Sequence, residues 1–148
     1  MTADVRALYQ GTILDHNRQP RNFRPLDGGF KVEGDNPLCG DHLVVYVRVN
    51  DGVIVEVTFQ GFGCAIARAS ASLMTESVTG KTVGEADELF RRVDRLVTLP
   101  AEAPVEDLGA LSALAGVRQF PVRVKCATLA WRTLRAATEA RDGVVTTE

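Results

Sequence analysis

The chain has no excess of basic residues and no long hydrophobic run. Its 17 lysines and arginines are balanced by 19 aspartates and glutamates, which gives a formal net charge of -2 over 148 residues. This balance argues against a nucleic-acid-binding protein, which normally carries a basic surface. No apolar stretch approaches the roughly 20 residues that a membrane helix needs, and the start, MTADVRALYQGTILDH, lacks the pattern of a signal peptide. We therefore expect a cytoplasmic protein that binds neither nucleic acid nor membranes.

Cysteine is also scarce, and its number limits what it can do. The three cysteines, Cys39, Cys64 and Cys126, are an odd number, which suits thiol chemistry or metal binding better than a disulfide framework. The chain contains no CxxC pair, so the spacing alone is only a weak indication of a metal site. Burial as small hydrophobic side chains is the common use of cysteine and stays open as the alternative.

What is present predicts an α+β protein in which strands precede helices. Residues 3–16 have the apolar spacing of an amphipathic helix. Alternating apolar residues predict strands at 43–49 and 53–59 joined by a tight turn at Asp51-Gly52, and a weaker strand at 30–33. Because no βαβ alternation follows, we expect a small antiparallel three-stranded sheet packed against several helices. One domain over 1–148 is expected.

The second half of the chain predicts helices. Thr82 and Glu85 form the capping-box pattern at the start of one of them, and Pro121 suits the first turn of another. The tail after Gly143 is expected to be frayed. The helical segments are expected at 64–79, from 83 onward, at 108–115, and along the apolar stripe from Cys126 to Ala137.

Cys39 and Cys64 both lie in glycine-rich sequence at the ends of predicted elements. A helix begins at Cys64, and the partial positive charge of a helix N-terminus stabilises a thiolate. Gly40 lets the chain turn between Cys39 and Asp41, and a strand would project both side chains to the same face. Cys126 lies on the inward stripe of its helix, so its side chain is able to converge with them.

Other polar residues have simpler interpretations. His42 alternates away from Asp41, which predicts a structural or solvated side chain on the opposite face. His16 lies near the end of the first helix, where the helix dipole favours a cation. Lys125 belongs with Thr128 to a polar stripe that is expected to face solvent. Residues such as Ser72 have no histidine base at usable spacing, so serine hydrolysis is not expected.

Four segments carry a resemblance to a known family. They are YQGTILDHNRQPRN, NPLCGDHL, GFGCAIARASASLMTESVTGK and VKCATLAWRTL. In this order they resemble the iron–sulfur assembly family of IscU and SufU proteins, which is related to the N-terminal part of NifU. The likeness covers nearly the whole chain, from Tyr9 to about Ala137, and implies a SufE/IscU-like fold. It implies a metal-ligand set of Cys39, Asp41, Cys64 and Cys126.

Two departures distinguish the branches of this family. IscU-type scaffolds have a histidine before the third cysteine and an LPPVK segment upstream, whereas Lys125 precedes Cys126 here and the upstream residues are QFPVR. The chain also has an extra helical segment at about 83–115. Both departures resemble SufU, which implies a zinc-bound sulfurtransferase that accepts persulfide sulfur from the cysteine desulfurase SufS and passes it to downstream iron–sulfur scaffold proteins.

On this interpretation Cys39 is the catalytic residue. Cys39 would leave the zinc when the desulfurase docks and attack the outer sulfur of the partner's persulfide, while the cysteines on helices hold the metal and Asp41 tunes its release. Two alternatives remain open. One is a scaffold that assembles a [2Fe–2S] cluster, or binds iron, on the same ligands, and the other is a structural zinc domain that only binds a partner.

Overall fold

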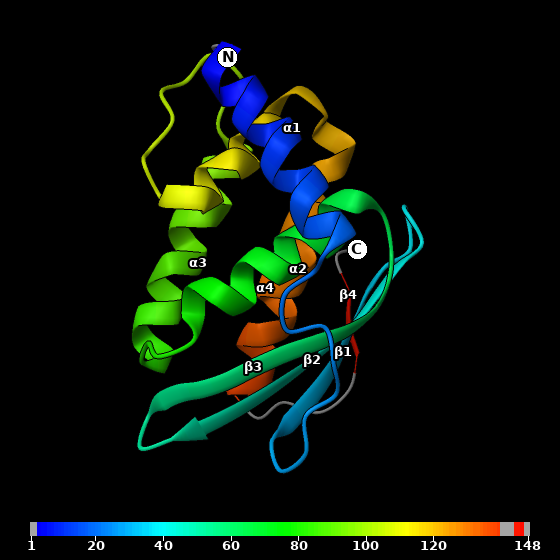
Figure 1. Cartoon of the computed structure of the whole chain (residues 1–148), viewed down its shortest axis with the longest axis vertical. Coiled ribbons are helices and arrows are strands. Elements are labelled where there is room, and N and C mark those ends of the chain that lie inside the picture. The colour runs from blue at the N-terminus through cyan, green and yellow to red at the C-terminus, as the bar shows by residue number, and fades with distance from the viewer. Residues whose placement is uncertain (1–2, 140–143, 147–148) are drawn as a thin grey trace.

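The computed structural model describes residues 3–139 and 144–146, and side-chain surroundings within residues 6–139. Helices lie over one face of a twisted sheet in the order α1, β1, β2, β3, α2, α3, η1, η2, α4 and β4 (Figure 1). The helices and helical turns are α1 (Ala3–Arg18), α2 (Ala65–Val78), α3 (Val83–Thr98), η1 (Gly109–Gln119), η2 (Pro121–Arg123) and α4 (Val124–Thr138). The strands are β1 (Phe30–Asn36), β2 (Asp41–Asn50), β3 (Val53–Phe62) and β4 (Val144–Thr146).

The expected antiparallel sheet is confirmed and gains one strand. The strand order is β3-β2-β1-β4, with β1, β2 and β3 antiparallel and β4 parallel to β1. The expectation of a frayed tail is therefore wrong for residues 144–146, which pair with β1 from Glu33 to Asp35. Backbone hydrogen bonds do not show in sequence periodicity, and a three-residue strand is too short to have a pattern of its own.

The hairpin between β2 and β3 forms as predicted, but its alternation shifts. Asp51 and Gly52 both have positive φ, as a tight two-residue turn requires. The register jumps between Arg48 and Val49 because Val55 is an extra residue on β3, a β-bulge. Val55 is consequently exposed and Ile54 is buried, the reverse of the simple alternation expected from the sequence.

The core lies between the sheet and the helices. Leu43, Val45 and Val47 point from β2 into it, as expected, and α4 packs on β1 and β2 while α2 packs on β3 and α4. The outer edge of β3 is covered by the loop after α1, where Asn22 accepts from and Arg24 donates to the backbone of Phe59. This pairing protects an edge strand that would otherwise be open to other chains.

The helices begin near the predicted residues. Cys64 is the N-cap of α2, and Thr82 and Glu85 form the predicted capping box of α3. The short helix expected at 108–115 is the longer 3-10 segment η1, and Pro121 begins the single turn η2 that precedes α4. None of the helices in the described part of the chain is long and apolar enough to cross a membrane.

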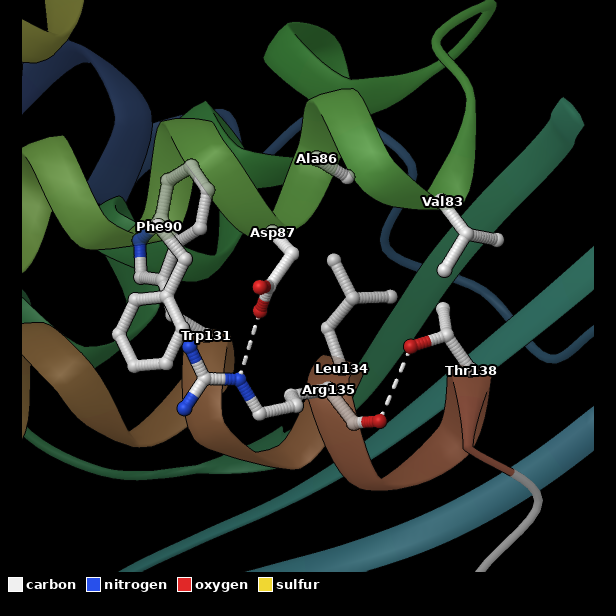
Figure 2. A pocket seen from close by; sticks show the side chains of 8 residues that line it. All are labelled: Val83, Ala86, Asp87, Phe90, Trp131, Leu134, Arg135 and Thr138. Atoms are coloured by element: carbon white, nitrogen blue, oxygen red, sulfur yellow. Dashed lines mark hydrogen bonds and ion pairs between the residues drawn. The ribbon is translucent and has the colours of Figure 1, made fainter.

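Trp131 on α4 is a packing residue. It is 1% exposed and stacks on Phe90 of α3 with ring centroids 6.2 Å apart. The Arg135 guanidinium lies over the Phe90 ring, 4.3 Å from its centroid, and its Nε donates to Asp87 at 2.8 Å (Figure 2). These contacts join α3 to α4.

The polar stripe expected on α4 faces solvent only in part. Lys125 is exposed, as expected, whereas Thr128 is buried.

Candidate metal centre

Three of the four expected ligands meet beside the start of β2. The sulfurs of Cys39 and Cys126 and a carboxylate oxygen of Asp41 all lie within 4.8 Å of one another. Asp41 and Cys126 are buried, whereas Cys39 is half-buried. The structure thus brings together residues from a turn, a strand and a helix, the first and last of them 87 positions apart (126 − 39) in the sequence.

Local backbone geometry explains how Cys39 and Asp41 come to face one point. Gly40 between them has a φ of +72°, which a residue with a side chain rarely adopts, so the turn closes directly onto β2. The Cys39 amide donates to the carbonyl of Asn36 at 3.2 Å, which fixes the turn to the end of β1. Cys126 reaches the same point because α4 packs on both β1 and β2.

Cys64 lies outside this group of three residues but is hydrogen-bonded to it. Its backbone amide donates to Oδ1 of Asp41 at 2.8 Å, and its sulfur accepts from the amide of Ala67 at 3.5 Å as the cap of α2. Its thiol also forms a hydrogen bond with Cys126. All four expected ligands are therefore connected through hydrogen bonds or short distances.

One hydrogen bond links the two helix cysteines and moves their pKa values in opposite directions. The hydrogen bond from Cys126 lowers the pKa of Cys64 to about 6, with a further contribution from the amide of Ala67. The same hydrogen bond, together with burial, raises the pKa of Cys126. This arrangement favours the thiolate form of Cys64 and the thiol form of Cys126.

The donor set fits a zinc ion. Zn²⁺ binds thiolate sulfur and carboxylate oxygen in four-coordinate sites. A carboxylate as well buried as Asp41, which is 2% exposed, is expensive unless it is paired or bound to a metal. A Cβ on Gly63 would lie 2.6 Å from Oδ1 of Asp41, so glycine at this position leaves the space that the carboxylate occupies.

Arg123 was missed as a site residue by the sequence reasoning. It ends η2, and its pKa is raised because its guanidinium hydrogen-bonds the sulfur of Cys126 and faces Cys64 and Cys39. A signal existed, because a basic residue three positions before Cys126 lies one helical turn away from it. The arrangement places a permanent cation beside the thiols.

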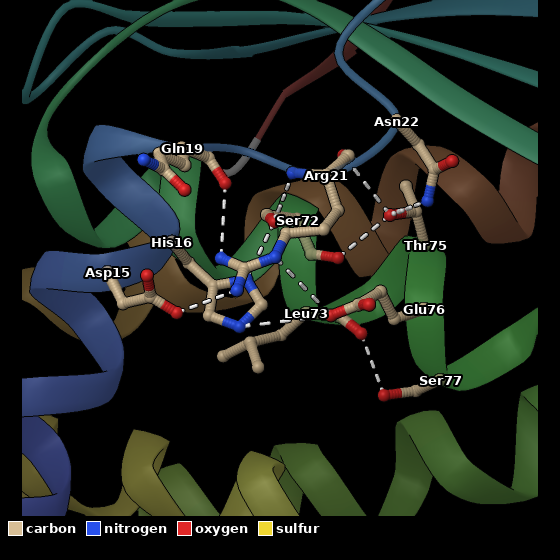
Figure 3. Close-up of polar contacts among 10 residues, drawn as sticks. All are labelled: Asp15, His16, Gln19, Arg21, Asn22, Ser72, Leu73, Thr75, Glu76 and Ser77. Atoms are coloured by element: carbon tan, nitrogen blue, oxygen red, sulfur yellow. Dashed lines mark hydrogen bonds and ion pairs between the residues drawn. The ribbon is translucent and has the colours of Figure 1, made fainter.

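His42 lies on the opposite face of β2 from Asp41, as expected. Its Nδ1 pairs with Asp35 across the strands, and it forms no part of the thiol cluster. The expectation for His16 is wrong, because His16 is buried and its Nδ1 lies 2.7 Å from Oγ of Ser72 on α2 (Figure 3). Burial lowers the pKa of His16, so at neutral pH its ring is uncharged and does not act as a cation at the end of α1.

Sequence spacing offered Ser72 no histidine base, but the fold places His16 next to it. These residues are 56 positions apart, so only the packing of α1 on α2 brings them together. Ser72 is fully buried and also accepts from the amide of Arg21 at 2.8 Å. A hydroxyl without access to substrate does not serve as a nucleophile, so hydrolysis remains unsupported.

We expect His16 to make folding sensitive to mild acid. The folded pKa lies below the unfolded value, so the unfolded chain takes up the proton first as the pH falls. The contribution of His16 to stability is complete above about pH 6.5 and is lost as the pH falls from there to the lowered folded pKa. Burial and the positive charge of Arg21 lower this pKa, whereas the carboxylates of Glu76 and Asp15 raise it and so reduce the effect. Urea unfolding from neutral to acidic pH measures this.

The matched variant for that measurement is His16→Gln, which keeps a polar side chain that does not titrate. Its stability should start lower, because the bond to Ser72 is altered, but should fall less steeply between pH 6.5 and the lowered folded pKa. Parallel curves for the two proteins would show that His16 is not the responsible group.

Comparison with known proteins identifies the family of this fold and site. Residues 8–127 match the NifU-like N terminal domain. The chain belongs to this family. Two relatives are the zinc-dependent sulfurtransferase SufU of Bacillus subtilis (strain 168), 34% identical over 141 residues, 95% of this chain and 96% of that protein, and the scaffold protein IscU of Streptococcus pyogenes serotype M1, 38% identical over 130 residues, 88% and 82%.

Solved structures of this family have the same fold. FiSufU, of the SUF system of Fervidobacterium islandicum AW-1, superposes with a TM-score of 0.78 at 32% identity, covering 88% of this chain and 96% of that one. A NifU-like N-terminal protein from Brucella abortus reaches the same TM-score of 0.78 at 21% identity, a likeness of fold alone. The sequence resemblance to the SufU and IscU family is confirmed.

Proposed function

We propose that this chain is a zinc-dependent sulfurtransferase of iron–sulfur cluster biogenesis, which accepts persulfide sulfur on Cys39 from a SufS-type cysteine desulfurase. The observation that carries the proposal is the convergence of Cys39 and Cys126 on the buried carboxylate of Asp41. The kinship with a zinc-dependent sulfurtransferase named SufU supports the choice of reaction. Iron–sulfur scaffold proteins downstream would receive the sulfur.

Cys39, Asp41, Cys64 and Cys126 would hold the zinc. When bound, the ion keeps the three sulfurs deprotonated at neutral pH, because thiolate is the form that binds a metal. Arg123 adds a second positive charge on the protein's side of the site. A carboxylate ligand is unusual in a structural zinc site, where cysteine and histidine predominate, which supports a role in chemistry.

Cys39 is the proposed acceptor because it is the most accessible of the cluster by its setting. It is half-buried on a turn, next to Leu38, which is 65% exposed. Cys64 is also half-buried, but its sulfur is engaged by Cys126 and by the amide of Ala67. Cys126 has no exposed surface at all.

The transfer step balances without an added oxidant. The Cys39 thiolate attacks the terminal sulfur of the donor's cysteine persulfide, a new S–S bond forms at Cys39, and the donor's S–S bond breaks. The donor cysteine leaves as a thiolate with the electron pair of that bond.

Apolar side chains beside the site, Leu38 and Phe62, 65% and 66% exposed, give the donor protein a surface to pack on.

A scaffold role is the second candidate, with a cluster as cargo on the same side chains. The relationship to IscU of Streptococcus pyogenes favours it. Lys125 argues against it, because this exposed lysine stands where IscU-type scaffolds have a histidine next to the third cysteine. A structural zinc domain without chemistry is the third candidate.

One experiment distinguishes the three. The aerobically purified chain is analysed for zinc and iron and then added to a SufS-type desulfurase with cysteine. The sulfurtransferase predicts about one zinc per chain and a several-fold rise in desulfurase turnover that disappears when the metal is removed. Iron and acid-labile sulfide in place of zinc would support the scaffold, and zinc without any effect on turnover would support the structural domain.

A further inference from the structure

Asn36 contacts three of the four expected ligands. It is the last residue of β1, has no exposed surface, and is the cross-strand partner of Asp41. Its Nδ2 donates to Oδ2 of Asp41 at 3.0 Å and to the sulfur of Cys126 at 3.3 Å. Its carbonyl accepts from the amide of Cys39 at 3.2 Å. One side chain and one carbonyl thus join the turn, the strand and helix α4 at the site.

The chemistry of an amide suits this position. A side-chain amide nitrogen carries two hydrogens, which matches the two acceptors, the carboxylate and the sulfur. Asn36 is neutral, so it satisfies a buried anion without adding a positive charge that would repel a metal cation. A lysine or arginine in the same place would pair with Asp41 and compete with the ion.

The fourth expected ligand is joined to this group through Asp41. The Cys64 amide holds Oδ1 of Asp41 at 2.8 Å, while Asn36 holds Oδ2. Each carboxylate oxygen therefore accepts a hydrogen bond from the protein and keeps acceptor capacity for a metal. The carboxylate is fixed from both sides before any ion arrives.

We propose that Asn36 is the positioning residue of the metal centre: it aligns the Asp41 carboxylate and the Cys126 sulfur for one ion and anchors the Cys39 turn beside them. This inference rests on the proposed function, because it assumes that these side chains bind a metal. Partners of this kind, which orient the ligands of a metal, are worth about 10- to 100-fold in metal affinity.

The decisive variant is Asn36→Leu, which has nearly the same shape and no hydrogen-bonding group. Zinc affinity, measured by competition with a chromophoric chelator, should fall about 10- to 100-fold. Cobalt bound in place of zinc should show its thiolate-to-metal charge-transfer band at lower energy, because the N–H donor of Asn36 stabilises the lone pairs of the Cys126 sulfur and its removal raises their energy. A purely structural role for Asn36 would not move that band.

Two further variants guard the interpretation. Asn36→Ser keeps one donor on a shorter side chain and should lose less affinity than Asn36→Leu; it carries the test if the leucine variant does not fold, which thermal unfolding of the metal-free protein reveals. Thr133→Val on α4 is the matched control, since Thr133, like Asn36, is fully buried. Its hydroxyl donates to the Leu129 carbonyl of its own helix. It should keep wild-type metal affinity.

The outcomes separate this proposal from the proposed function. If the wild-type chain binds neither zinc nor cobalt, the proposed function fails and the role of Asn36 fails with it. If the wild-type chain binds both metals and the folded Asn36 variants bind them equally well, with an unshifted cobalt band, only the role of Asn36 is overturned. Reduced affinity in the Asn36 variants with a normal Thr133→Val protein supports it.

Discussion

Cys39→Ser should abolish sulfur acceptance while leaving the fold intact. After incubation with a desulfurase and cysteine, the wild-type chain should gain the mass of one sulfur atom, lost again on reduction, and the variant should gain none. The reason is chemical, because a serine hydroxyl is a far weaker nucleophile than a thiolate at neutral pH. Cys39 lies on a half-buried turn, so the substitution should change the melting temperature little.

Cys64→Ser is the matched comparison, because the thiol pKa of Cys64 is lowered to about 6 and this makes it the rival nucleophile. If Cys39 is the acceptor, the Cys64 variant still gains sulfur, even where it holds metal less well. If Cys64 is the acceptor, the pattern reverses, with sulfur on the Cys39→Ser protein and none on Cys64→Ser. That reversal would contradict the proposed mechanism while leaving the metal centre in place.

Cys126→Ser should cause the larger loss of metal. Zinc binding by four ligands is worth about 10–16 kcal/mol in small zinc domains, so one ligand corresponds to about 3 kcal/mol, or about a hundredfold in affinity. Cys126 is fully buried, so water is poorly placed to replace its sulfur. Cys39 is half-buried, and its loss should weaken binding less.

The measurement is chelator competition on the two variants side by side, with Thr128→Val as the control. Thr128 is also buried on α4, and its hydroxyl donates to the backbone of its own helix, so this control tests a neighbouring substitution of similar size. Equal zinc affinity of Cys126→Ser and wild type would show that Cys126 is not a ligand and that only the other three residues remain as candidates.

The order of elements and most of their ends follow from the sequence because their causes are local. The Asp51-Gly52 turn needs two positive φ values, and the capping box at Thr82 needs only residues three apart. The inward face of β2 follows from its alternation. The three cysteine motifs were likewise readable, and so was the placement of Gly40 between Cys39 and Asp41.

The tertiary structure alone decided how distant residues meet. The bulge at Val55 arises from pairing with β2, and the parallel pairing of β4 with β1 joins residues 144–146 to residues 33–35. His16 reaches Ser72 only because α1 packs on α2. Asn36 and Cys126 are 90 positions apart, and no periodicity within either segment reports a hydrogen bond between them. Local patterns specify which face of an element is buried, whereas the contacts that make a metal centre depend on how those faces pack together.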